Sequence, residues 1–106
     1  MEITFFYIPI GSNTEATELG EKAIESKLAA CSNIFPVSSA FHWKGILERE
    51  EEFVLVLKTI PSLTIPLRTF IEDNHPYDIP CILSWNAEVN DVYGKWMIGE
   101  LEVSSE

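Results

Sequence analysis

Three side chains in this sequence, Cys31, His75 and Cys81, could together hold a soft metal ion. Thiolate and imidazole are the ligands that Cu(I) and Zn²⁺ prefer, and a tight site needs three or four of them to converge. His42 and Met97 are the other candidates for such a set. Because the two cysteines belong to no paired-cysteine motif, we expect two reduced, buried thiols rather than a disulfide.

Two of these residues belong to a rigid corner at residues 74–82, which contains Pro76 and Pro80. Each proline fixes its own φ and disfavours helix in the residue before it, so a helix must end before the corner and an extended segment must follow. Two roles for His75 stay open. It can hydrogen-bond the last carbonyls of the preceding helix, or its ring can contribute to a ligand site.

Hydrophobic periodicity predicts the elements that position this corner. Strands are expected at residues 3–8, 31–43, 53–59 and 79–85, and helices at 13–29, from 62 or 64 to 74, and near 92–101. Ser12 with Glu15 forms a capping-box pattern, and Ser62 or Thr64 is expected to cap the second helix. Lys44 and Gly45 predict a hairpin turn, followed by an acidic, solvated arm at residues 46–52. Pro36 cannot donate to a ladder, so it predicts an edge strand or a bulge.

This order of elements predicts an α+β, ferredoxin-like split β-α-β sandwich. Its antiparallel sheet has the strand order four, one, three, two, with helices on one face and a C-terminal helix in addition. The first two strands run parallel, so Cys31 is expected at the opposite end of the sheet from His75 and Cys81. Both sheet edges are left unpaired, which favours association of subunits.

Composition limits the partners. With 106 residues, the chain predicts one domain at 1–102 and a polar tail at 103–106. A net charge of −10, from 7 Lys+Arg against 17 Asp+Glu, makes nucleic acid and membrane surfaces unfavourable partners. The opening residues do not follow a signal-peptide pattern, so a cytoplasmic location is expected.

Catalysis is not predicted. The sequence contains no glycine-rich phosphate loop, no nucleophile elbow and no H-E-x-x-H motif. A nucleophilic Cys31 would need His75 beside it, and the predicted topology separates the two.

Several motifs together resemble the CutA divalent-cation tolerance family. They are residues 27–34 (KLAACSNI), Trp43 with Gly45, Lys58 with Thr59, His75-Pro76-Tyr77 with Pro80, and Tyr93 with Trp96. The resemblance implies a ferredoxin-like fold, a compact homotrimer with interlocked hairpins that is similar to the trimer of PII signalling proteins, and a link to tolerance of divalent metals, copper in particular. Departures are Lys44 and Ile46 beside the hairpin glycine, and Cys81 in place of the usual acid. A cysteine there would favour Cu(I) or Zn²⁺ over Mg²⁺ or Ca²⁺.

We therefore expect a cytoplasmic homotrimer with weak metal binding, no required cofactor and no catalysis. Trp43, Tyr77 and Trp96 are expected at subunit interfaces or clefts. The alternative is a PII-like sensor or adaptor that binds a small ligand or a protein partner in clefts between subunits near His75 and Tyr77. A purely structural trimer is a third possibility.

Overall fold

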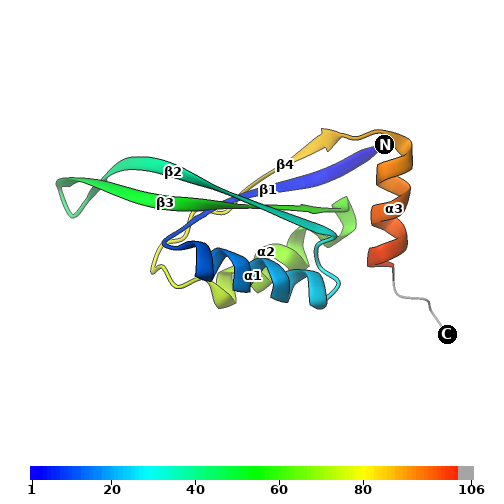
Figure 1. Cartoon of the computed structure of the whole chain (residues 1–106), viewed down its shortest axis with the longest axis horizontal. Helices are drawn as coiled ribbons and strands as arrows, with labels where there is room; N and C mark the ends of the chain where they lie inside the picture. Colours follow the sequence, from blue (N-terminus) through cyan, green and yellow to red (C-terminus); the bar gives the residue numbers. More distant parts are fainter. Residues whose placement is uncertain (103–106) are drawn as a thin grey trace.

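The computed structural model describes residues 1–102, and the predicted tail at 103–106 lies outside them. Strands and helices follow the predicted order (Figure 1). They are β1 (Glu2–Ile10), α1 (Asn13–Glu25), β2 (Cys31–Trp43), β3 (Ile46–Thr59), a short 3₁₀ turn (Pro61–Leu63), α2 (Thr64–Asn74), β4 (Leu83–Glu88) and α3 (Asp91–Leu101).

The four strands form one sheet in the order β2-β3-β1-β4, and every neighbouring pair is antiparallel. This confirms the predicted split β-α-β topology. Phe5 lies opposite Lys58, which lies opposite Cys31, so the first two strands run parallel with β3 between them.

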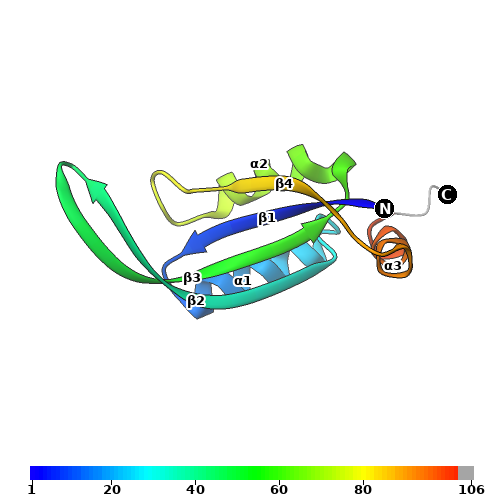
Figure 2. The same cartoon turned by 90° about the horizontal axis from the view of Figure 1, so that it is seen from above.

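One face of the sheet is covered by α1 and α2, which lie side by side beneath it (Figures 1 and 2). The core between sheet and helices is aliphatic with one large aromatic residue. Its members include Phe6, Ile8 and Ile10 of β1, Leu55 and Leu57 of β3, Ala16, Leu19 and Ala23 of α1, and Leu67 and Ile71 of α2. Burial of these side chains is the main favourable contribution to folding.

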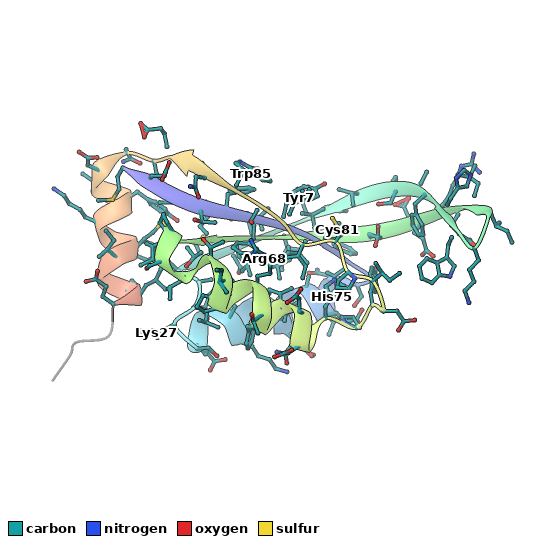
Figure 3. The ribbon with its side chains drawn as sticks, turned by 180° about the vertical axis from the view of Figure 1, so that it is seen from behind. Tyr7, Lys27, Arg68, His75, Cys81 and Trp85 are labelled. Carbon is teal, nitrogen blue, oxygen red and sulfur yellow. The ribbon has the colours of Figure 1, made fainter. Side chains whose placement is uncertain are left out.

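The opposite face of the sheet, which we call the open face, has no helix over its centre. Because side chains alternate along a strand, Phe5 and Tyr7 of β1 point to this face. Trp85 of β4 lies directly opposite Phe5, with their rings 4.7 Å apart, and keeps 47% of its surface exposed. Figure 3 shows Tyr7 and Trp85 away from α1 and α2. The first strand is therefore covered fully on one face only, among the described residues.

Beyond Ile10 and its partner Phe53, β2 and β3 continue without a third strand. This two-stranded ribbon, which we call the arm, projects from the body and gives a molecule of 52 × 26 × 21 Å (Figure 1). Lys44 and Gly45, at φ 52° and 80°, form its tight turn. The register passes Pro36 without a shift, so β2 is an edge strand and carries no bulge.

Several predicted boundaries were wrong. The first helix ends at Glu25 rather than at residue 29, because Lys27 takes φ 61° while its N–H and that of Leu28 bond back to Ile24 and Ala23. This is a Schellman termination, usually built on glycine. The fourth strand begins at Leu83 rather than at residue 79.

The capping of the second helix also differs from the prediction, although the helix begins at Thr64, one of the two predicted positions. Neither Ser62 nor Thr64 caps it through a side chain; Leu63 occupies the N-cap position, and Thr64 instead donates its hydroxyl hydrogen bond to Thr4 of β1. Ser12 does cap α1, because its Oγ accepts from the Glu15 N–H at 3.1 Å.

Candidate functional site

The proline corner meets the sheet where β1 ends and the arm begins. His75 directly follows α2 and leaves the helix with φ −77° and ψ 136°, as expected for a residue before proline. The residue is 9% exposed. Nε2 donates to the Pro9 carbonyl oxygen at 2.9 Å, and Nδ1 accepts from the Tyr77 N–H at 3.1 Å.

Both ring nitrogens of His75 are thus used within the fold, and a neutral imidazole with its proton on Nε2 satisfies both contacts. The ring ties the corner to the end of β1. Metal binding through either nitrogen would require one of these hydrogen bonds to break. Of the two roles left open by the sequence, the contacts support a structural one, although the ring bonds Pro9 rather than the helix carbonyls.

Tyr77 connects the corner to the base of the arm. Its ring packs edge-on against His75, and its hydroxyl donates to Glu52 Oε2 at 2.6 Å. Glu52 is 7% exposed. Burial, followed by the hydrogen bond to Glu52 and the negative charges of Glu52, Glu50 and Glu15, raises the pKa of Tyr77 well above its usual value of 10.0.

A cleft of about 790 Å³ lies between the arm and the corner. The arm contributes Phe41, Trp43, Glu48, Glu50 and Glu52 from its open face, and the corner contributes Tyr77, Asp78, Ile79 and Cys81. Its volume falls within the range of small-molecule sites, about 300–1,000 Å³. Cys81 is exposed, which corrects the prediction that both thiols are buried.

The sequence predicted an acidic, solvated arm at residues 46–52. The structure shows that the arm is not wholly solvated. Glu52 is buried because it is the last residue of the arm before β3 enters the sheet, where the corner covers it. The apolar run that begins at Phe53, directly after Glu52, was the signal in the sequence that Glu52 is buried. The burial itself depends on Tyr77, which is distant in sequence.

Cys31 lies at the other end of the sheet, as the topology predicted. It is half-buried beside Lys58, its cross-strand partner, and Tyr93 of α3. Burial and, after it, the neighbouring Cys31 thiol raise the pKa of Tyr93 to about 12. Lys58 Nζ lies 5.5 Å from the centre of the Tyr93 ring.

The predicted metal ligands therefore do not come together within this chain. Among residues 1–102, no group of three or more His, Cys, Asp or Glu side chains could hold a metal ion. Cys81 is the candidate ligand left accessible in the cleft, together with His42 of the arm.

The three residues predicted at interfaces or clefts are partly exposed. Trp43 on the arm exposes 40% of its surface, Tyr77 exposes 36%, and Trp96 on α3 exposes 46%. Trp43 and Tyr77 line the cleft, whereas the Trp96 ring packs at a tilt against Tyr93 on α3, with ring centroids 5.4 Å apart. Trp85, which no sequence pattern pointed to, is equally exposed on the open face.

The fold and the corner define a class of protein, the ferredoxin-like α+β domains with an extended hairpin arm. Comparison with known proteins gives the family: residues 4–100 match the family described as CutA1 divalent ion tolerance protein. The chain belongs to this family, which confirms the resemblance drawn from its motifs.

Relatives agree with this assignment. The chain is 40% identical over 78 residues to the divalent-cation tolerance protein CutA of Archaeoglobus fulgidus, covering 74% of this chain and 76% of the relative. It is 34% identical over 93 residues to a CutA homologue of Xenopus laevis, covering 86% of this chain and 62% of that protein.

Solved structures are also similar. The periplasmic divalent cation tolerance protein CutA of A. fulgidus superposes with TM-score 0.90 at 34% identity, covering 94% of this chain and 99% of that one. CutA1 of Ehrlichia chaffeensis superposes with TM-score 0.91 at 27% identity, covering 95% of this chain and 96% of that one. No helix within residues 1–102 is long and apolar enough to cross a membrane.

Proposed function

We propose that the protein acts in tolerance of divalent metal ions, copper in particular, as a homotrimer that binds metal weakly and catalyses no reaction. The observation that carries this proposal is the family match across residues 4–100. A cytoplasmic location is part of the proposal, although the similar A. fulgidus structure is described as periplasmic.

Subunit association is supported by the shape of the chain. An isolated two-stranded ribbon is at best marginally stable in water, and the arm exposes Phe41, Trp43, Ile46 and Leu47. Within residues 1–102, the outer edges of β2 and β4 have no partner strand, and Trp85 of the open face keeps 47% of its surface exposed. Neighbouring subunits would cover these surfaces and remove both edges.

Weak rather than tight metal binding is supported by the scattered ligands. His75 is engaged in hydrogen bonds at both nitrogens, and Cys31 is distant, so Cys81 would have to bind a soft ion with few partners from its own chain. A third or fourth ligand would have to come from another subunit or from solvent.

Titration of Cu(I) under reducing conditions tests this proposal. We expect weak binding that Cys81→Ser lowers further and that His75→Gln leaves unchanged, with oligomer mass followed in parallel. Tight stoichiometric binding that is lost in both variants would contradict a purely structural role for His75. Loss of copper tolerance in cells that lack the gene, restored by the wild-type chain, tests the physiological role.

A second candidate function is a PII-like sensor or protein-interaction adaptor. It is favoured by the cleft between arm and corner, whose volume suits a small ligand. Thermal-shift screening separates the two: stabilisation by an organic metabolite supports the sensor, and a response only to soft metals supports metal tolerance.

A further inference from the structure

The arm leaves the body of the molecule as a two-stranded ribbon (Figure 1). On β2 it runs from Val37 to Trp43, which is roughly 20 Å at about 3.4 Å per residue. Two-stranded ribbons twist more than wider sheets do and are only marginally stable alone. A change of angle at the base of the arm therefore displaces the exposed side chains of Trp43 and Ile46 at its tip.

One polar contact between side chains joins the arm to the rest of the chain. The Tyr77 hydroxyl donates to Oε2 of Glu52, the last arm residue before β3 enters the sheet. Within residues 1–102, no other side-chain hydrogen bond and no salt bridge connects the arm to a segment outside β2 and β3. Toward the tip, the cleft of about 790 Å³ separates the arm from the corner.

This contact has the geometry of a strong hydrogen bond. Its length of 2.6 Å is that of a hydroxyl donating to a carboxylate. Glu52 is 7% exposed, and a hydrogen bond is stronger in the low dielectric of a protein interior than in water. Because the donor prefers to lie near the plane of the acceptor group, the bond restrains the angle of the arm as well as its distance from the Tyr77 ring.

The corner that carries Tyr77 is itself held to the sheet. The Tyr77 ring packs edge-on against His75, with ring centroids 4.6 Å apart, and its backbone N–H donates to Nδ1 of His75. Nε2 of the same histidine donates to the carbonyl oxygen of Pro9, near the end of β1. Pro76, between the two aromatic residues, fixes its own φ. A continuous path of contacts therefore runs from β1 through the corner to the base of the arm.

We propose that the hydrogen bond between Tyr77 and Glu52 is a latch that sets the direction of the arm, and that both residues thereby position the arm for association of subunits. They act through the arm, so neither the hydroxyl nor the carboxylate has to contact a neighbouring subunit. The latch rests on the homotrimer of the proposed function, in which neighbouring subunits cover the arm, and it adds the contact that positions the arm for them.

Sedimentation across a range of protein concentrations tests the latch. Tyr77→Phe keeps the ring but loses the bond to Glu52, and we expect association to weaken at least about tenfold. Thr59→Val is the matched control, because it removes a buried hydrogen bond to the Leu28 carbonyl oxygen at the opposite end of β3. It should lower stability and leave association unchanged. Equal weakening by Thr59→Val would overturn the proposal, because the effect would then follow from a general loss of stability.

Substitutions at Glu52 separate the latch from a direct contact of Tyr77 with a neighbouring subunit. Glu52→Met removes the acceptor, so we expect it to weaken association as much as Tyr77→Phe does. The double variant should show no further weakening, because both substitutions remove the same bond. Glu52→Gln keeps a carbonyl that can accept from Tyr77 and should weaken association less. Weakening by Tyr77→Phe alone, additive effects in the double variant, or equal weakening by Glu52→Gln would each overturn the proposal.

Hydrogen exchange of the backbone amides tests the latch without reference to association. In Tyr77→Phe, compared with wild type in the same oligomeric state, we expect faster exchange at residues 37–52 and unchanged exchange at residues 54–58, which pair on both sides. Unchanged exchange in the arm would overturn the proposal. A monomeric wild-type protein would contradict the homotrimer, and the exchange experiment would still decide the latch. A trimer in which Tyr77→Phe alters neither exchange nor association would refute the latch alone.

Discussion

Tyr77 and Glu52 form the shortest side-chain hydrogen bond described in residues 1–102, at 2.6 Å, and it joins two parts of the chain that are distant in sequence. The Tyr77→Phe variant removes the donor and leaves the buried carboxylate without it. Loss of a hydrogen bond to a buried charged group costs about 1.5–3 kcal/mol. Urea denaturation should show a fall of this size in the free energy of unfolding.

The Tyr7→Phe variant is the control for that measurement, because Tyr7 lies on the open face and its hydroxyl makes no hydrogen bond within residues 1–102. Unchanged stability in Tyr77→Phe would contradict a contribution of this hydrogen bond to the stability of the fold.

Tyr93 predicts a dependence of stability on pH. Its pKa is raised to about 12 in the folded protein from the ordinary 10.0, so the unfolded chain loses its proton first. Stability from this group is therefore complete below pH 10 and is lost as pH rises toward 12. Unfolding measured across this window should give a fall that is smaller in Tyr93→Phe.

Only the difference between wild type and variant reports on Tyr93. Parallel pH profiles of the two proteins would contradict the raised pKa.

At the scale of elements, the end of α1 contains a non-glycine residue in the left-handed region. Lys27 at φ 61° carries a steric cost that glycine does not. We expect Lys27→Gly to raise the free energy of unfolding by about 0.5–1 kcal/mol, measured by denaturant titration.

Lys22→Gly provides the contrast, because Lys22 lies inside α1, where glycine costs about 1 kcal/mol relative to a good helix former. Destabilisation by both substitutions would show that the Lys27 side chain makes a contribution larger than its backbone strain.

Element types followed from local patterns, whereas boundaries did not. The alternation and apolar runs of the strands, the Ser12 cap and the Lys44-Gly45 turn are properties of neighbouring residues. The end of α1 at Glu25 is formed by bonds within residues 23–28, but it places a lysine where glycine is usual, so no signal for it was present in the sequence. The late start of β4 at Leu83 depends on pairing with Tyr7, which no short window of sequence contains.

At the scale of the whole molecule, association of subunits should depend on the exposed aromatic residues. In the proposed trimer we expect Trp96→Ala to weaken association at least about tenfold, because buried interface tryptophans commonly contribute 2 kcal/mol or more. Sedimentation across a range of protein concentrations measures this effect.

Val92→Ser is a control on the same helix, since Val92 is 81% exposed and its neighbours do not cover it. A monomer at all concentrations in the wild-type protein would contradict the homotrimer, and an intact trimer in Trp96→Ala would place Trp96 outside the interface.

The sequence by itself determined the class of fold, the family and the position of the corner, because periodicity, prolines and motif order are encoded in local residue types. It also determined that Cys31 and His75 lie apart, since strand direction follows from element order. Only the tertiary structure decided that His75 is engaged at both nitrogens, that Cys81 is exposed and that Glu52 is buried beneath Tyr77. Each of these depends on where the chain after α2 passes over the base of the arm, and contacts between such distant segments are set by packing rather than by local sequence.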